Sequence, residues 1–404
     1  MDGAMCQWVP ASASMTFAAA LQQAATAPTA EETAEREPLR VIRDPYPSFS
    51  SVAVDIERGE VIAGDENLFQ VLVYDRMDNT PPGARMTEPK RIIAGDQTGL
   101  EFICGLHVDQ NTGDIYVINA DTAAQMQVFS RDQEGNVPPS RVLNTGHETR
   151  GRGIAVDEEN QELFIASQHN AAVAVFRQHA EPDERPIRLL QGDQTRLANP
   201  HGMAFDQRND LLFVTNHGQV ASRPDRDEVT DPENKRLNTP LPRRVAVRGS
   251  GRFLPASINV YRRDASGNEA PLRVIQGPKT QLNWPAGIVI DEEQRELFVA
   301  NDTGNSVLVF PADASGDVAP IRVIKGPDTE LDAPGGIFLD PTNKELWVSN
   351  YGNHSLNVYP LDADGNTPPL RRIRSGPADT RALMIGNPGA LAYDTQREEI
   401  LVPN

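Results

Sequence analysis

Reactive side chains recur at one position of the chain, directly before short apolar segments that begin with a small residue. Cysteine, arginine and histidine take this position in three successive copies, as Cys104, Arg152 and His201. Two further imidazoles, His169 and His217, follow neighbouring apolar segments. Guanidinium and imidazole groups bind carboxylates, and imidazole and thiolate bind metal ions. If the fold brings these five residues together, they form a pocket for a small anion or a metal ion.

A second concentration of charge lies in a long insertion. Asn216 and Tyr261 are 45 residues apart, whereas the matching pair Asn301 and Phe310 is 9 apart, so an insertion of 36 residues lies at about 217–256. Its second half contains six basic residues and no acidic one: Lys235, Arg236, Arg243, Arg244, Arg248 and Arg252. On a chain of net charge −19, a basic loop favours docking on an acidic partner surface. The alternative is a solvated insertion without a partner.

The elements that must position these residues repeat along the chain. An apolar segment ending in aspartate occurs seven times: Asp55, Asp109, Asp157, Asp206, Asp291, Asp340 and Asp394. A second apolar segment follows each of them and ends at Gly64, Asn119, Ser167, Asn216, Asn301, Asn350 and Asn404. A third segment ends in Tyr or Phe, and a fourth contains an arginine: Arg40, Arg91, Arg141, Arg188, Arg273, Arg322 and Arg371. Four short strands repeated about every 50 residues are typical of a β-propeller.

We therefore predict an all-β fold, a seven-bladed β-propeller of four-stranded antiparallel blades. The first arginine-bearing segment, 38–42, precedes any first strand, and the last copy stops after two strands. The N-terminal outer strand is expected to pair with the C-terminal inner strands and close the ring, which removes an exposed edge. Residues 1–37 then form an N-terminal arm, and residues 38–404 form a single propeller domain that carries the insertion.

The repeats also resemble a known group of propellers. Pro285 to Asp291 with Leu297 to Asn301, and Leu212 to Asn216, resemble NHL and YVTN-type β-propeller repeats, and the likeness spans residues 38–404. Seven copies favour the lactonase-like seven-bladed superfamily over six-bladed NHL domains. The resemblance implies a ring around a central channel that binds proteins, glycans or small molecules. Some members of these families are lactonases or lyases.

The channel mouth is the expected place for chemistry, because the first strands begin and the second strands end at the same face. A lactonase-type calcium site requires an acid there, and none of the fourteen positions read from the repeat is Asp or Glu. The repeated asparagines are expected to cap backbone groups in the following loop, and Asn216 is also a candidate for binding. The repeated aspartates are interpreted as turn residues, and the repeated arginines as guards of the outer edge strands.

Composition excludes several classes of function. With 57 acidic and 38 basic residues, the chain would repel nucleic acid and anionic membranes, and no apolar run approaches the roughly 18 residues that span a bilayer. Two cysteines, Cys6 and Cys104, are too few for a disulfide framework. Repeats of this type are often exported, which favours the periplasm, the cell surface or the exterior. The lack of Lys or Arg before Arg36 argues against a secretory signal.

Two functions remain from the sequence. The first is a non-catalytic binding or scaffold propeller without a cofactor, a subunit of a larger assembly. Its protein partners would contact the rim-face loops, the insertion and the N-terminal arm. The alternative is a lactonase- or lyase-type enzyme in which Arg152 and His201 polarise a small anionic substrate at the channel mouth.

Overall fold

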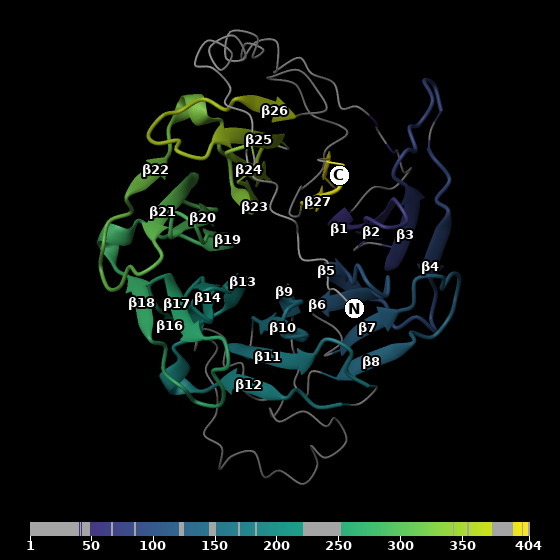
Figure 1. The fold of residues 1–404 in the computed structure, drawn as a ribbon, viewed down its shortest axis with the longest axis horizontal. Helices are drawn as coiled ribbons and strands as arrows, with labels where there is room; N and C mark the ends of the chain where they lie inside the picture. Colours follow the sequence, from purple (N-terminus) through teal and green to yellow (C-terminus); the bar gives the residue numbers. More distant parts are fainter. Residues whose placement is uncertain are drawn as a thin grey trace, which may run out of the picture.

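The computed structural model is an all-β ring of antiparallel sheets arranged around a common axis (Figure 1). It describes Arg40, Ile42 and residues 49–402, apart from internal stretches of which the longest are 145–150, 221–251 and 374–390. Within these residues the helices are single 3-10 turns: η1 (Asp193–Thr195), η4 (Pro278–Thr280) and η5 (Pro327–Thr329). The predicted N-terminal arm and most of the insertion lie outside the described residues.

Six sheets are complete four-stranded blades. Blade 1 contains β1 (Phe49–Asp55), β2 (Glu60–Asp65), β3 (Gln70–Asp75) and β4 (Arg91–Ala94). Blade 2 contains β5 (Phe102–Val108), β6 (Ile115–Ala120), β7 (Gln125–Phe129) and β8 (Arg141–Asn144). Blade 3 contains β9 (Gly151–Asp157), β10 (Glu162–Ser167), β11 (Ala172–Arg177) and β12 (Arg188–Gln191).

The other three complete blades follow the same order. Blade 4 contains β13 (Pro200–Asp206), β14 (Leu211–Asn216), β17 (Ser257–Arg262) and β18 (Arg273–Gln276). Blade 5 contains β19 (Pro285–Asp291), β20 (Glu296–Asn301), β21 (Ser306–Pro311) and β22 (Arg322–Ile324). Blade 6 contains β23 (Pro334–Asp340), β24 (Glu345–Asn350), β25 (Ser355–Pro360) and β26 (Arg371–Ile373). In each blade the first strand lies innermost (Figure 1).

Apolar side chains fill the space between neighbouring blades. Leu163 and Ile165 of β10 pack with Tyr116 and Ile118 of blade 2, whereas Phe164 between them packs on the blade 4 side, against Leu212. Successive strand residues point to opposite faces, so a strand with a blade on each side needs an unbroken apolar run. This explains why the second strands read as continuous apolar segments.

The seventh blade is described by two strands, β27 (Ala392–Asp394) and β28 (Glu399–Leu401), which lie between blade 6 and blade 1 (Figure 1). Ile42 packs in one cluster with Phe49, Ala392 and Leu401. Arg40 forms an ion pair with Glu399 at 2.7 Å and donates to the carbonyl of Arg76 in blade 1 at 3.0 Å. An N-terminal residue thus lies against the C-terminal strands, as ring closure requires.

The fourth-strand arginines of blades 1, 2, 3 and 5 are held in ion pairs inside their own blades. Each of these four pairs with a carboxylate at the start of the second strand, at 2.7, 2.7, 2.6 and 2.6 Å in Arg91–Glu60, Arg141–Asp114, Arg188–Glu162 and Arg322–Glu296. Arg40 repeats this pair with Glu399, so it occupies the fourth-strand position of blade 7. These arginines therefore join strands within blades through ion pairs. The prediction of a role at the outer edge strand did not include these pairs.

Blade 4 departs from this arrangement. Its second strand begins with Leu211 instead of an acid, and Arg273 donates to the carbonyl of Ala312 in blade 5 at 2.8 Å. Burial lowers the pKa of the Arg273 guanidinium, whereas the pKa of the paired Arg322 is raised by its hydrogen bond to Glu296. Blade 4, the blade with the insertion, is thus the complete blade with the least strongly fixed fourth-strand arginine among those whose side chains are described.

The seven repeated aspartates open the turns between first and second strands, as predicted. In each turn a carboxylate oxygen accepts a backbone N–H two or three residues later, for example Arg58 to Asp55 at 3.0 Å and Asn343 to Asp340 at 3.0 Å. The turn face, which we define as the face that carries these turns, lies opposite the channel mouth considered below. Because every blade uses its aspartate in this way, we assign these carboxylates a structural role in the turns and do not consider them catalytic candidates.

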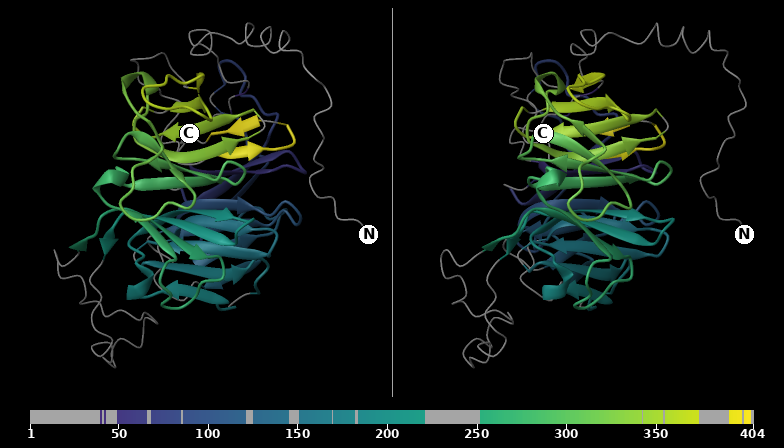
Figure 2. Two further views of the ribbon diagram at one scale, coloured as in Figure 1. Left: turned by 60° about the vertical axis from the view of Figure 1, so that its left-hand side comes forward. Right: turned by 90° about the vertical axis from the view of Figure 1, so that its left-hand side faces the viewer.

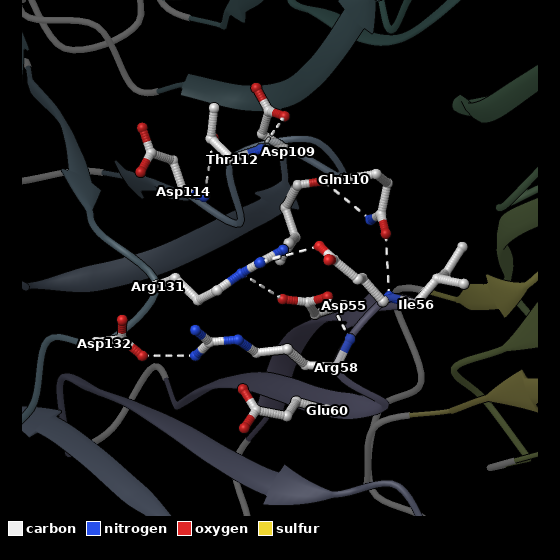
Figure 3. A network of polar contacts seen from close by, with 12 residues as sticks. Asp55, Ile56, Arg58, Glu60, Asp109, Gln110, Thr112, Asp114, Arg131 and Asp132 are labelled. Atoms are coloured by element: carbon white, nitrogen blue, oxygen red, sulfur yellow. Dashed lines mark hydrogen bonds and ion pairs between the residues drawn. The ribbon is translucent and has the colours of Figure 1, made fainter. Parts of the chain in front are cut away.

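The same aspartates also join neighbouring blades. Figure 3 shows the junction of blades 1 and 2, where Arg131 of blade 2 lies 2.9 Å from a carboxylate oxygen of Asp55. Gln110 spans the same junction, donating to the carbonyl of Val54 at 2.9 Å and accepting the N–H of Ile56 at 3.0 Å. These contacts bridge residues more than 50 positions apart and tie one blade to the next.

The junction of blades 2 and 3 uses a different side chain. Arginines reach the aspartate of the preceding blade in four other junctions: Arg131–Asp55, Arg263–Asp157, Arg295–Asp206 and Arg76–Asp394. Asp109 instead meets Gln178 at 3.0 Å and His179 at 3.6 Å. An amide and an imidazole therefore take the place that a guanidinium, with its permanent charge and forked donors, holds in the other four junctions.

Candidate functional site

The channel mouth lies on the rim face, which we define as the face where first strands begin and second strands end. In all six complete blades the pairing of the first two strands shifts register at this point, which is the mark of a β-bulge. The register skips the residues that the sequence placed at the mouth: Ser50, Cys104, Arg152, His201, Ala286 and Gly335. Bulges re-aim side chains and are common beside functional sites. The seventh predicted position, Gly389, lies outside the described residues.

Glycines next to the bulges let the inner strands approach each other closely. A Cβ on Gly153 would lie 2.4 Å from the carbonyl oxygen of His201, and a Cβ on Gly202 would lie 2.3 Å from that of Ala286. The hydroxyl of Thr215 donates a hydrogen bond to the same carbonyl of Ala286 at 2.9 Å. The backbone around His201 is therefore fixed from both neighbouring blades.

Two of the predicted imidazoles meet at this mouth. The rings of His201 and His217 stack with centroids 3.5 Å apart and planes 19° apart. The amide nitrogen of Gln168, at the end of the second strand of blade 3, lies 2.6 Å from His201 Nε2. His217 follows β14 and is 7% exposed, and its backbone N–H donates to the backbone carbonyl of Asn199 at 3.1 Å. Residues from blades 3 and 4 thus meet at the mouth, and His201 and His217 lie in contact there.

A tryptophan that the sequence reading missed completes the stack. The ring of Trp284, which directly precedes β19 of blade 5, lies 4.5 Å from that of His217 with the planes 27° apart. Trp284 is 44% exposed and has φ of 56°, in the left-handed region. The same position holds Asn199 in blade 4 and Ala333 in blade 6, at φ of 57° and 49°. The signal available in the sequence was a large aromatic residue at a repeat position that blades 4 and 6 fill with Asn199 and Ala333.

Left-handed backbone suits asparagine and is unfavourable for a bulky residue, at about 1 kcal/mol. Strain of this kind gathers at functional sites and supports a hypothesis of function. Phe102 of blade 2 takes the equivalent position, is 37% exposed and lies 6.3 Å from the ring of Phe69. Half-exposed aromatic rings therefore occupy the mouth in two blades, whose first strands β5 and β19 lie across the channel from each other (Figure 1).

The remaining predicted site residues are placed as follows. Cys104 is half-buried in the bulge of β5, and β9 separates its strand from β13 (Figure 1). Arg152 lies in the bulge of β9, but its side chain is outside the described part of the structure, as is all of His169. Within the insertion, the basic residues Lys235, Arg236, Arg243, Arg244 and Arg248 are likewise outside it, and Arg252 is described by its backbone alone.

Asn216 takes the capping role that was expected of the repeated asparagines. Its side chain is fully buried and accepts the N–H of Ala198 at 2.9 Å, and Asn119, Asn301 and Asn350 accept the N–H groups of Glu101, Asn283 and Asp332 in the same way. The capped loop precedes the first strand, whereas we expected the loop after the second strand. The side chains of these asparagines hold the mouth in shape and do not face the channel as ligand groups.

One acid stands at the rim where the sequence reading found none. In blade 1 the second strand ends at Asp65 and not at Gly64, since Asp65 pairs with Gln70 as Asn301 pairs with Ser306. Asp65 is fully buried and accepts the N–H of Leu68 at 2.9 Å and the amide of Gln70 at 3.0 Å. The absence of acids at the mouth was therefore an error of register by one residue. Among the described residues, His, Cys, Asp and Glu form no group of three suited to a metal ion.

The insertion leaves the rim face through a short ribbon beside the imidazole stack. β15 (Gln219–Val220) pairs with β16 (Arg252–Phe253), and the ribbon projects from this face (Figure 2). Its base is bonded to blade 4, where Leu254 donates to Gly218 at 2.7 Å and Gly218 donates to Ala198 at 2.9 Å. A hollow of about 250 Å³ lies at this base, lined by Asp193, Arg196, Ala198, Leu254, Pro255, Ser257 and Gln276.

Comparison with known families agrees with this architecture. Residues 255–378 match the sequence model of a family described as Lactonase, 7-bladed beta-propeller, a stretch that runs from blade 4 through blade 6. No curated protein matches the chain. The chain is thus a β-propeller protein, and the match of this segment is consistent with the lactonase-like superfamily that its repeats resemble. The family is seven-bladed, and the described residues supply six complete blades and two strands of a seventh. Within them no helix is long and apolar enough to cross a membrane.

Proposed function

We propose that this protein is a non-catalytic binding propeller, a subunit of a larger assembly, that docks a protein partner on its rim face. The observation that carries the proposal is the anchoring of the insertion. Its ribbon is bonded to blade 4 through Gly218 and Leu254, and Asn199 donates to Gln219 at 3.1 Å. A long insertion with a fixed base, beside exposed aromatic rings, is suited to hold a partner in one orientation.

The chemistry of the mouth favours binding over catalysis. The repeated aspartates and arginines are engaged in turns and ion pairs, as described above. His201 and His217 stack on each other, and Nε2 of His201 already lies at hydrogen-bond distance from Gln168. A general base needs a ring nitrogen directed at the substrate. Stacked rings with a neighbouring amide fit a recognition surface better.

The expected partner surface is acidic, because the insertion carries six basic residues between 235 and 252. The test replaces residues 221–251 with Asn-Gly, a two-residue turn typical of β-hairpins, so that β15 and β16 form a hairpin. The native mass of the variant in extracts of its own cells is expected to fall to that of the 44.2 kDa chain less the deleted residues, while the intact protein migrates in an assembly. An assembly of unchanged mass would overturn the docking role of the insertion.

A charge-reversal variant separates electrostatics from loop length. Changing Lys235, Arg236, Arg243 and Arg244 to Glu keeps the length of the insertion and is expected to release the partner. Changing Arg177, an exposed arginine on blade 3, to Glu is the matched control and is expected to leave the assembly intact. We further propose an extracytoplasmic location, which cell fractionation tests directly.

A lactonase- or lyase-type activity is the second candidate, and the match of residues 255–378 to a lactonase family favours it. In this case Arg152 and His201 would polarise the carbonyl or carboxylate of a small anionic substrate at the mouth. Hydrolysis of sugar lactones by the purified protein, lost in the double variant R152A/H201A, would establish it. Partner binding without turnover in both proteins would exclude it.

A further inference from the structure

We infer that Trp284 is the binding platform for a planar organic cation at the channel mouth. The group is a pyridinium-type or guanidinium plane stacked on the indole. The inference goes beyond the proposed docking function, because it concerns the mouth between blades 4 and 5 and not the insertion.

The geometry of the rings supports a further stacked group. The His201 and His217 rings have centroids 3.5 Å apart and planes 19° apart, and the His217 and Trp284 rings have centroids 4.5 Å apart and planes 27° apart. The three rings therefore form a column. The column ends at Trp284, which is 44% exposed, whereas His217 inside it is 7% exposed. A planar ligand extends such a column with the offset stacking that aromatic rings prefer.

The backbone of Trp284 is the second, independent observation. Trp284 has φ of 56°, at a position that holds Asn199 in blade 4 and Ala333 in blade 6. A bulky residue in the left-handed region persists where its side chain is needed. Packing alone does not require the indole, since blades 4 and 6 form the same turn without it.

Electrostatics selects a cation. The face of an indole ring is negative, and tryptophan binds cations more strongly than the other aromatic residues. The backbone N–H of Asp302 donates to the backbone carbonyl of Trp284 at 3.1 Å, so a half-buried acidic residue, whose pKa is raised by burial, contacts the backbone of the platform residue. The protein as a whole has a net charge of −19, which raises the local concentration of cations.

The test uses 1-methylnicotinamide, a pyridinium cation, and nicotinamide, its neutral counterpart of nearly equal shape. The chain has three tryptophans, Trp8, Trp284 and Trp347, so the variant W8F/W347F leaves the Trp284 indole as the sole reporter. We expect saturable quenching of its fluorescence with a dissociation constant of about 1 mM, and binding of nicotinamide at least fivefold weaker. Binding is followed in the same titration by the charge-transfer absorption of a stacked indole and pyridinium.

Matched variants keep the inference falsifiable. W284N places at this position the residue that blade 4 carries at nearly the same φ, so the substitution suits the local backbone. Binding of 1-methylnicotinamide to W284N, measured by calorimetry, is expected to fall at least tenfold, and D302N is expected to weaken binding severalfold in the reporter background. Equal binding of nicotinamide, linear quenching without saturation, or unchanged affinity in W284N would each overturn the inference.

A competition experiment identifies the natural source of the cation. Displacement of 1-methylnicotinamide by Nα-acetylarginine amide, and not by the citrulline counterpart, would support a guanidinium of a protein partner. Resistance to displacement would support a free heteroaromatic cation. Loss of the partner assembly on deletion of 221–251 is a separate result, so failure of the docking proposal and failure of the cation site are distinguishable.

Discussion

In several blades a single carboxylate joins the second strand to the fourth-strand arginine, and Glu60 of blade 1 is an example. Glu60 at the start of β2 is 3% exposed and accepts bonds from both nitrogens of the Arg91 fork, at 3.0 and 2.7 Å, and from Lys90 at 2.7 Å. Burial opposes its ionisation, but the hydrogen bonds from Arg91 and Lys90 outweigh burial and lower its pKa to about 2. A carboxyl with a lowered pKa stabilises the folded state at neutral pH.

We expect Glu60→Gln to lower the free energy of unfolding by about 2 to 3 kcal/mol at pH 7, because it removes one partner of a buried ion pair. The folded-state pKa is below the ordinary value, so the stabilisation is complete above about pH 4.5 and is lost as the pH falls towards about 2. Urea unfolding at several pH values should show the two proteins converging at the acid end. Glu184→Gln is the control: the pKa of Glu184 is also about 2, through its bonds to Arg177 and the Glu181 backbone, but its exposed pair should change stability far less.

The junction of blades 2 and 3 offers a second test at the scale of residues. His179→Arg places a permanent cation beside Asp109, which the imidazole now meets at 3.6 Å, as arginines do in four other junctions. We expect it to raise the melting temperature by a few degrees, because a guanidinium offers the Asp109 carboxylate a forked set of donors. Arg263→His, the reverse change between blades 3 and 4, should lower it. An unchanged melting temperature for His179→Arg would contradict this account.

The elements at the mouth owe their shape to bulges and close backbone contacts. The repeat pattern predicted the strands and the face on which their ends gather, because burial on both sides imposes apolar runs that sequence displays directly. It did not predict the exact register of blade 1, since Gly64 and Asp65 both fit a strand end. It also missed Trp284, because its contact with His217 joins two blades through a left-handed residue that no periodicity records.

The close contacts give a prediction with an internal control. Gly202→Ala puts a Cβ 2.3 Å from the carbonyl oxygen of Ala286 and is expected to destabilise the protein by about 2 to 4 kcal/mol. Gly105 takes the same place in blade 2, where the nearest atom to an added Cβ is Ile154 Cγ2 at 3.5 Å, an ordinary contact. Gly105→Ala should therefore change stability by less than about 1 kcal/mol in denaturant unfolding. Equal effects of the two substitutions would show that the inner strands of blades 4 and 5 are less closely packed than described.

The whole molecule depends on the closure of the ring. The copy count in the sequence predicted that the N-terminal segment completes the last blade, and Arg40 now supplies the contact: its two partners, Glu399 and the carbonyl of Arg76, match those of a fourth-strand arginine. What the sequence does not reveal is the second connection across the same junction, where Arg76 pairs with Asp394 and Glu399. These pairs join residues at opposite ends of the chain, so a pattern that repeats within single blades does not predict them.

We expect Arg40→Ala to lower the free energy of unfolding by about 1 to 3 kcal/mol and to increase amide exchange in β1, β27 and β28 more than elsewhere. The reason is that the variant leaves Glu399 with one arginine fewer and the seventh blade without its outer contact. Hydrogen exchange with peptide mapping measures the effect. Uniform exchange over all blades would show that closure is not a local property of this junction.

The contact between Arg40 and Glu399 also has a consequence for biosynthesis. The two residues are more than 350 positions apart, so the ribosome releases one long before the other. At about 5 to 20 residues per second, the side of blade 1 that faces blade 7 waits tens of seconds for its neighbour. During this interval the side chains of Tyr74 and Val52 lack the cover of Ala392 and Leu401 from the seventh blade. The nascent chain is therefore a natural client for chaperones that bind apolar strands, and its demand for them ends when the last blade is made.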